Sequence, residues 1–133
     1  MLIESTPAIV QVPIAQVFDF LKDVSNLYHL LPHDKISGWE ATDSQCSFKI
    51  QGGIIIPLVL NETNEFTSIQ MNSGVKSPFP FTLTVKLEDL GGSTKGSLVF
   101  DAKVSKTIQF IAERPLRNLF NTMAEKLAIH YTQ

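Results

Sequence analysis

The sequence predicts an α+β protein, in which a curved antiparallel sheet of six to seven strands holds a long C-terminal helix and two short helices follow the first strand. Apolar residues recur at helical spacing over residues 13–31 and 107–133, whereas most of the intervening chain alternates between apolar and polar residues. Two glycine pairs, Gly52-Gly53 and Gly91-Gly92, divide this alternating region as tight hairpins do, which predicts antiparallel pairing. A lone long helix buries its apolar side across such a sheet, so we expect either a core or a pocket between them.

The first elements are marked by two prolines. A strand is predicted at Ala8–Val12, followed by a helix that begins at Pro13, because the fixed φ of proline suits a first helical turn. A second short helix carries Leu27, Leu30 and Leu31 and ends before Pro32, because the residue preceding a proline avoids the helical conformation.

The central strands show which side chains face the closing helix. Alternation assigns an inward face made of Cys46, Phe48, Ile50, Ile69, Met71, Phe81, Leu83, Val85, Leu98, Phe100 and Ala102. This face contains no carboxylate, histidine or lysine. The run Ile54–Leu60 is apolar at every position, so its inward face does not follow from the pattern, and Asn61–Asn64 after it has the composition of a turn.

The closing helix is predicted from Thr107 to Gln133. Its apolar stripe consists of Ile108, Ile111, Leu116, Leu119, Phe120, Met123, Leu127 and Tyr131. Pro115 lies inside this stripe and predicts either a kink or a separate first turn before a helix that begins near Arg114. Because the stripe continues past the proline, one kinked helix is the favoured interpretation.

Length and charge narrow the class of protein. At 133 residues the chain is predicted to form a single domain over residues 1–133, burying about two-thirds of its unfolded surface. Hydrophobic residues make up 44% and charged residues 18%, which excludes a disordered chain and indicates a large apolar interior. The net charge of −2 supplies no basic field, so we expect no nucleic-acid partner.

The N-terminal residues predict no export. They contain no basic segment followed by an apolar run, so a signal peptide is not expected. The longest apolar run, Ile54–Leu60, contains Pro57 and falls well short of the ~18 residues that span a bilayer. We therefore predict a cytoplasmic protein without a transmembrane segment. Cys46 is the only cysteine, which rules out an intramolecular disulfide.

Four local features match a known family. They are the strand-to-helix run Val12–Leu21, the ending Leu30-Leu31-Pro32, Trp39 on the next strand, and Glu113–Asn121 in the closing helix. Together with the order of the elements, these features resemble the START-like, helix-grip superfamily, which includes lipid carriers, polyketide cyclases and aromatases, and coenzyme-Q-binding proteins. The resemblance covers nearly the whole chain and implies a deep, mostly hydrophobic cavity between the closing helix and the concave face of the sheet. The superfamily has no universal catalytic motif, so the resemblance implies no catalytic residue.

The predicted ligand site is the apolar wall of this cavity. It comprises Trp39, Phe48, Ile69, Met71, Phe81, Leu83, Phe100, Leu116, Phe120, Met123 and Leu127. The polar side chains predicted at the cavity mouth are Arg114, Arg117 and His130. Such a wall favours binding an apolar molecule over transforming a polar one. We predict no catalytic residue, no metal and no cofactor.

Several polar residues have competing interpretations. His29 and His33 have the spacing of a helical metal pair, but Pro32 breaks the helix between them and favours a surface turn. His130 either complements the helix dipole or acts as an acid or base at the mouth. Cys46 is interpreted as a small buried hydrophobe rather than a nucleophile.

Two further groups admit more than one role. Trp39 and Tyr28 form either an aromatic gate or, as the favoured interpretation, part of the core. Arg114 and Arg117 oppose the helix dipole, which predicts an ion-pair partner such as Glu113 or Asp101, or an acidic group of a ligand.

Three functions are consistent with the sequence. The leading hypothesis is binding or transport of a lipid, an isoprenoid or a polyketide-like aromatic, and a cavity too small for a fatty acid would contradict it. The second is an enzyme like a polyketide cyclase or aromatase, which requires inward polar residues; the candidates are Thr6, Thr67, Ser73 and His130. The third is a homodimeric or regulatory module with a filled core, supported if the outward face of Ile54–Leu60 is apolar.

Overall fold

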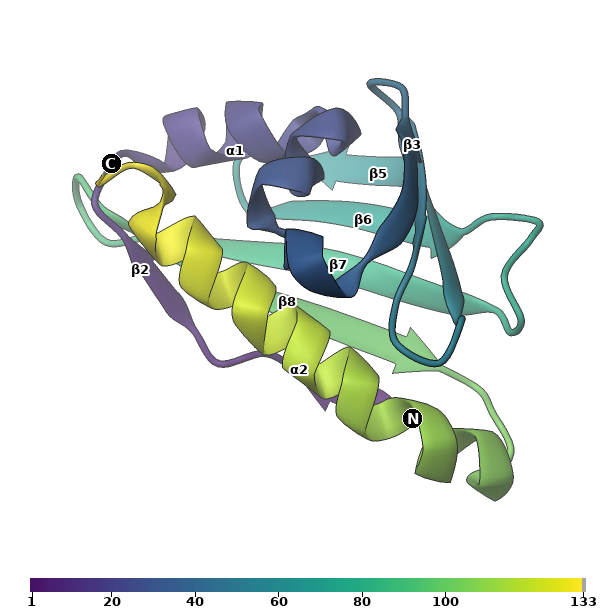
Figure 1. The fold of residues 1–133 in the computed structure, drawn as a ribbon. Coiled ribbons are helices and arrows are strands. Elements are labelled where there is room, and N and C mark those ends of the chain that lie inside the picture. Colours follow the sequence, from purple (N-terminus) through teal and green to yellow (C-terminus); the bar gives the residue numbers. More distant parts are fainter. Residues whose placement is uncertain (133) are drawn as a thin grey trace.

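A computed structural model describes residues 1–132, and its elements follow the predicted order (Figure 1). The elements are β1 (Leu2–Glu4), β2 (Ala8–Val10), α1 (Ile14–Lys22), the 3₁₀ helices η1 (Val24–Leu30) and η2 (His33–Lys35), β3 (Ser37–Ala41), β4 (Gln45–Lys49), β5 (Ile55–Asn64), β6 (Ser68–Ser73), β7 (Phe81–Asp89), β8 (Thr94–Ala102) and α2 (Lys106–His130). The protein is therefore α+β, with a curved, unclosed antiparallel sheet and a long C-terminal helix, as predicted.

The sheet runs in the order β1-β8-β7-β6-β5-β4-β3, and β2 also pairs with β8. β1 and β2 follow one another along the same edge of β8, interrupted at Ser5. The Ser5 amide donates to the carbonyl oxygen of Leu98 at 2.9 Å, and the Ser5 hydroxyl accepts from the Leu98 amide at 2.9 Å. This serine keeps β8 hydrogen-bonded where the edge strand breaks. β1 was absent from the prediction.

Both predicted glycine hairpins are present. Gly52 and Gly53 have φ values of 86° and 76°, and Gly91 and Gly92 have φ values of 83° and 107°. These left-handed conformations are accessible to glycine without steric cost. Gly91-Gly92 turns the chain within two residues, between Leu90 and Ser93, and Gly52-Gly53 belongs to a three-residue loop between Ile50 and Ile54. The second hairpin sets the longest register in the sheet, from Phe81 opposite Ala102 to Asp89 opposite Thr94.

β5 corrects one prediction and answers an open question. The predicted turn at Asn61–Asn64 is wrong, because the strand continues through it after a register shift between Leu60 and Glu62. These polar residues are exposed near the end of the strand, which is why their composition imitates a turn. In the apolar half of the strand, Ile56 and Leu58 face the core, each 1% exposed. Alternation then places Pro57 and Val59 on the outer face.

Three helical elements cover the concave face of the sheet. The sequence predicted only the closing helix across this face. α2 lies along β1, β2 and β8 and against η1, whereas α1 lies on β6 and β7 and η1 lies on β3 and β4 (Figure 1). The leucines of η1 therefore share the interior with the closing helix. This sharing leaves less space under α2 than a single covering helix would leave.

α2 is one continuous helix that begins after Ser105, whose hydroxyl accepts from the Ile108 amide at 3.3 Å. Pro115 lies within the helix, so the alternative of a separate first turn is wrong. The buried face starts at Ala112 and consists of Ala112, Leu116, Leu119, Phe120, Met123, Ala124 and Leu127. Ile108 and Ile111, predicted to belong to this face, are 38% and 63% exposed, because the first turns extend past the end of the sheet (Figure 1).

Candidate functional site

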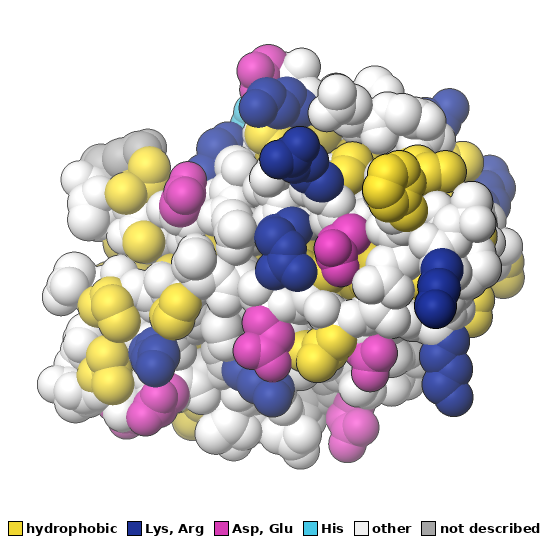
Figure 2. All heavy atoms as spheres, turned by 90° about the horizontal axis from the view of Figure 1, so that it is seen from below, with side chains coloured by type: hydrophobic (Ala, Val, Ile, Leu, Met, Phe, Trp, Pro, Cys, Tyr) yellow, Lys and Arg dark blue, Asp and Glu magenta, His cyan; other side chains and the backbone are white. Residues whose placement is uncertain are grey.

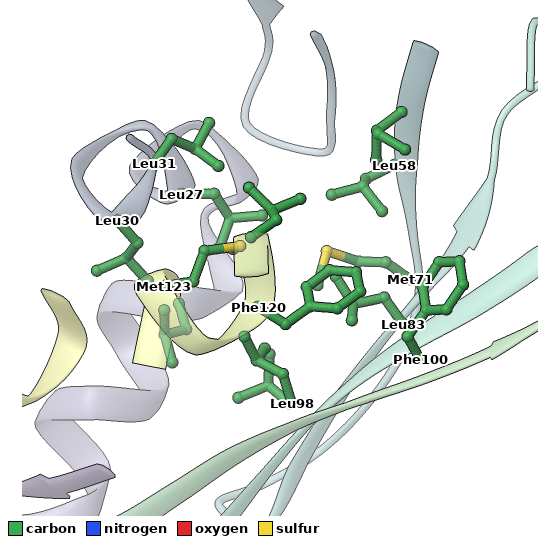
Figure 3. Close-up of a cluster of buried hydrophobic side chains, with 14 of the residues drawn as sticks. Leu27, Leu30, Leu31, Leu58, Met71, Leu83, Leu98, Phe100, Phe120 and Met123 are labelled. Atoms are coloured by element: carbon green, nitrogen blue, oxygen red, sulfur yellow. The ribbon is translucent and has the colours of Figure 1, made fainter. Parts of the chain in front are cut away.

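Side chains fill the space between α2 and the sheet. The close-up of the interior shows leucines of η1, residues of β5 to β8 and residues of α2 pointing toward one another (Figure 3). Ten of the eleven predicted wall residues belong to this buried cluster, and Trp39 packs against it half-buried. The ring of Phe120 lies 5.1 Å from that of Phe100, which lies 4.9 Å from that of Phe81. These rings join the closing helix to the sheet as predicted.

A void of about 10 Å³ remains under α2. Its walls are Leu21, Leu27, Leu30, Val85, Gly96, Ser97, Leu98, Met123, Ala124 and Leu127. A void of this size holds about one water molecule, so this conformation lacks the deep cavity implied by the family resemblance and has no room for a fatty acid. Binding of a lipid between α2 and the sheet therefore requires another conformation, in which the interior is open. Only Met123 and Leu127 were among the predicted site residues. The leucine spacing of η1 was visible in the sequence, but its partner surface was not.

The interior comes close to the surface at one seam. A depression of about 60 Å³ lies between η2, the β4–β5 hairpin and α2, lined by Pro32, Lys35, Ile36, Ile50, Gln51, Pro115, Asn118, Leu119 and Thr122. Two of its lining residues, Ile50 and Leu119, also belong to the core cluster. A displacement of α2 here would connect the core to solvent.

Two polar contacts hold α2 to its neighbours. The ammonium group of Lys126 donates to the carbonyl oxygen of Leu31, at the end of η1, over 2.5 Å. The Thr6 amide, between β1 and β2, donates to Oδ1 of Asn121 over 2.9 Å. The remaining contacts of this helix with the interior are apolar, so α2 is fastened chiefly by packing.

The three predicted mouth residues do not come together. Arg114 and Arg117 are exposed near the start of α2, whereas His130 is about 20 Å away at its other end, given a rise of 1.5 Å per residue. Within residues 1–132 the one ion pair joins Lys22 to Asp19 at 3.3 Å, so the predicted ion pairs of the two arginines are wrong. Surface arginines on a mobile stem keep their hydration unless a carboxylate is held in place beside them.

His130 belongs to an aromatic cluster instead. Its ring lies 4.5 Å from that of Phe20, 4.9 Å from that of Tyr131 and 5.8 Å from that of His29. Burial, and secondarily the nearby His29, lowers the pKa of His130 below its ordinary 6.5. The hydroxyl of Tyr131 is buried without a hydrogen-bond partner in the described chain, and burial raises the pKa of that group.

His29 and His33 both lie beside Tyr28, whose ring is 6.2 Å from that of His29. The ring of His33 stacks on that of Tyr28 at 4.1 Å, and its Nε2 contacts the carbonyl oxygen of Tyr28 at 2.6 Å. Tyr28 in turn lies 5.3 Å from Trp39, whose ring is 6.1 Å from that of Phe48. No group of three metal-ligating side chains gathers in residues 1–132.

The groups required for catalysis are not directed into the void. Of the four candidates, Thr6 and Thr67 are exposed and Ser73 accepts a hydrogen bond from the Phe81 amide at 3.2 Å. None of these residues or His130 lines the void in the described part of the chain. Burial raises the pKa of the Cys46 thiol to about 12, so this cysteine stays protonated and is a poor nucleophile. The four polar residues that the cyclase hypothesis named therefore do not reach this void.

A wider hollow lies on the face of the sheet opposite the helices. It has a volume of about 650 Å³ and spans β3 to β6 and the loop after β6; its walls are Glu40, Ala41, Thr42, Gln45, Cys46, Ser47, Pro57, Val59, Asn72, Ser73, Gly74, Val75 and Lys76. Pro57 and Val59 are the outward residues of β5 that the sequence left unassigned. No pattern in the sequence predicted the hollow, because it arises from the curvature of neighbouring strands.

Known proteins share this architecture at low sequence identity. No protein-family model matches the chain, and no curated protein matches it in sequence. The KanY protein matches with a TM-score of 0.76 and 13% identity, over 100% of this chain and 98% of KanY. A START superfamily protein from Mycobacterium smegmatis matches with a TM-score of 0.70 and 15% identity, over 99% of this chain and 97% of that protein.

A biosynthetic protein shares the fold as well. The di-domain ARO/CYC protein BexL, from the BE-7585A biosynthetic pathway, matches with a TM-score of 0.72 and 12% identity, over 99% of this chain and 46% of BexL. The protein therefore has the START-like, helix-grip fold that its sequence resembles. At these identities the likeness concerns the fold alone. Within residues 1–132, no helix has the length and hydrophobicity needed to cross a bilayer.

Proposed function

We propose that this protein binds and carries a small hydrophobic molecule, such as a lipid, an isoprenoid or a polyketide-like aromatic, between α2 and the sheet. The observation that carries the proposal is the lining of the interior void, which includes no ionisable side chain. A site with such walls gains affinity from apolar surface and has no charged side chain to pair with a charged group of a ligand. The START-like fold of the similar structures supports the same class of function. We further propose that the carrier works in the cytoplasm.

Binding requires the interior to expand, because the void in this conformation holds about one water molecule. Met71 and Met123 suit this requirement, since unbranched thioether side chains adopt new rotamers at low cost. The seam at Pro115 and the contact between Lys126 and Leu31 are the places where α2 would separate from its neighbours. The proposed site therefore opens only when the ligand binds and α2 separates from its neighbours.

A titration with one representative of each ligand class tests the proposal. Palmitate, farnesol and a tricyclic anthraquinone are added while the fluorescence of Trp39, the single tryptophan, is recorded and native mass spectrometry counts bound molecules. We expect one of them to bind saturably at one molecule per chain. Absence of binding by all three, from a folded protein, would contradict the proposal.

A matched pair of variants locates the site. Ala124→Val adds two methyl groups to a residue that lines the void, and we expect it to weaken binding. Ala128→Val makes the same change one turn later on α2, at a residue outside that lining, and we expect it to bind as the unaltered protein does. Equal weakening by both variants would place the ligand elsewhere.

The filled interior and the outer hollow support a second candidate, a homodimeric interaction module. Pro57, Val59 and Val75 form apolar parts of the hollow, and apolar hollows of this kind mark protein contacts. Light scattering should then show a concentration-dependent dimer that Val59→Lys disrupts. The control Thr84→Lys alters the outer face of β7, outside the hollow, and should leave the dimer intact. A monomer at all concentrations would exclude this candidate.

A further inference from the structure

The first turns of α2 expose large apolar side chains to solvent. Phe110 is 89% exposed and Ile111 is 63% exposed, although the helix begins to bury its apolar residues only one position later, at Ala112. A phenylalanine with this exposure gains nothing from the fold of its own chain. The position therefore suggests contact with something outside the molecule.

Basic side chains surround Phe110 on the same side of the helix. Lys106 and Arg114 lie four residues before and after it, and Arg117 lies seven residues after it, so the helical repeat places all four on one face. That face is turned away from Leu116, which the same helix carries into the core. Residues 103–117 hold four basic side chains and one acidic one, a net charge of +3 in a chain whose total is −2.

Other segments bring similar side chains to the same end of the sheet. β8 ends at Ala102 opposite the first residue of β7, so the loop before β7 and the segment leading into α2 are neighbours. That loop contributes Val75, which is fully exposed, and Lys76 beside it. In the view from below, Lys and Arg side chains, and hydrophobic ones among them, lie along the right-hand edge, where α2 begins (Figure 2).

We propose that this end of the molecule docks on the surface of a bilayer that contains anionic lipids. Phe110 and Ile111 enter the boundary between headgroups and acyl chains, while Lys106, Arg114 and Arg117 contact lipid phosphates. Phe110 and Ile111 project from the end of a helix and line none of the three hollows described above. A bilayer accommodates such projections anywhere on its surface, whereas a protein partner would need a matching cavity for each.

The inference goes beyond the proposed carrier function and does not depend on it. It does indicate from where the carrier would take up its ligand, because the docking face adjoins the depression lined by Pro115 and Asn118. A molecule docked in this way would present its seam to the bilayer, where apolar molecules are dissolved.

Co-sedimentation with vesicles tests the docking. The unaltered protein is mixed with vesicles of phosphatidylcholine alone, or of phosphatidylcholine with about a third phosphatidylserine. We expect binding to the anionic vesicles alone, weakened by added salt. Replacing both arginines by Arg114→Gln and Arg117→Gln should lower the affinity about 25-fold, at about fivefold for each basic residue removed. Phe110→Ser should weaken binding without changing its salt dependence.

Matched controls keep the test specific. Ile129→Ser alters an apolar side chain that is 50% exposed at the other end of α2, and Lys95→Gln removes a basic side chain of β8 near the opposite hairpin. Both should bind anionic vesicles as the unaltered protein does. The proposal is overturned if folded protein does not bind anionic vesicles, which would leave this face to an acidic protein partner, or if the controls weaken binding as much as Phe110→Ser. Binding of whichever of the three test ligands the unaltered protein takes up is measured in parallel for the Phe110→Ser variant. This binding should persist, which distinguishes a failure of membrane docking from a failure of ligand binding.

Discussion

The ammonium group of Lys126 lies 2.5 Å from the carbonyl oxygen of Leu31, and this contact joins the closing helix to the end of η1. Both elements cover the concave face of the sheet, and the apolar interior lies beneath them. Leu31 itself is fully buried, so its carbonyl group depends on a partner within the protein. The contact therefore holds α2 and the end of η1 together above the apolar interior.

Removing this contact should loosen the interior. Lys126→Met keeps most of the side-chain volume but leaves the Leu31 carbonyl unpaired, and we expect the free energy of unfolding to fall by about 1–2 kcal/mol. Urea denaturation measures the loss, and Lys22→Met, in an exposed pair with Asp19, should change stability by less than about 1 kcal/mol. An unchanged stability for Lys126→Met would mean that the contact has no role in holding α2.

Two phenylalanines on α2 should respond very differently to truncation. Phe120 is 1% exposed, and Phe120→Ala should lower the free energy of unfolding by about 3–5 kcal/mol because it leaves a cavity in the core. Phe110 is 89% exposed, so Phe110→Ala should change stability by no more than about 0.5 kcal/mol. Similar losses in urea denaturation for the two variants would show that the first turns of the helix pack elsewhere than described.

Replacing Ser5 should weaken the edge of the sheet. Ser5→Ala leaves the amide of Leu98 without its acceptor in a buried setting, which should cost about 1–3 kcal/mol. Hydrogen exchange of the Leu98 amide should become faster than in the unaltered protein. If exchange at this amide is unchanged, another group satisfies it.

Acidification should destabilise the protein through His130. Its folded-state pKa lies below 6.5, so below that pH the unfolded chain binds more protons than the folded one, and the free energy of unfolding falls as the pH falls. His130→Gln should reduce this dependence in urea denaturation between pH 7.5 and the region below 6.5. His33→Gln leaves the rings of His29 and His130 in place and should retain it, and identical pH profiles for all three proteins would contradict the assignment.

Cys46 should be unreactive while the protein is folded. With a pKa of about 12 and 4% exposure, its thiol yields almost no accessible thiolate at neutral pH. Iodoacetamide should therefore modify Cys46 in urea but not in buffer, as mass spectrometry can show. Rapid modification of the native protein would contradict this prediction and would show that reagent reaches the thiol from the outer hollow, which Cys46 borders.

The sequence predicted those parts of the fold that follow from a local period. Phe81, Leu83 and Val85 alternate with polar residues over a long strand, and side chains of a strand alternate between faces, so their inward direction follows directly. Met71 and Phe120 were placed in the interior for the same kind of reason. The glycine pairs were equally informative, because their conformations are open to few other residues.

The remaining features depend on where elements end and on how much volume they fill. Ile108 and Ile111 continue the apolar period of α2, but no period reveals that the sheet stops before it reaches them. Likewise, Leu27 and Leu30 were recognised as apolar, yet only their position in space shows that they fill part of the predicted cavity. Arg117 lacks the predicted ion pair because no carboxylate is held beside it.

The central claim is that the interior beneath α2 opens to take up an apolar molecule. Native mass spectrometry of the protein incubated with palmitate, farnesol or the anthraquinone tests it most directly, with Ala124→Val and Ala128→Val beside the unaltered chain. The account predicts one bound molecule for the unaltered protein and Ala128→Val, and clearly less for Ala124→Val. Unliganded protein in every sample, with the fold intact, would contradict it.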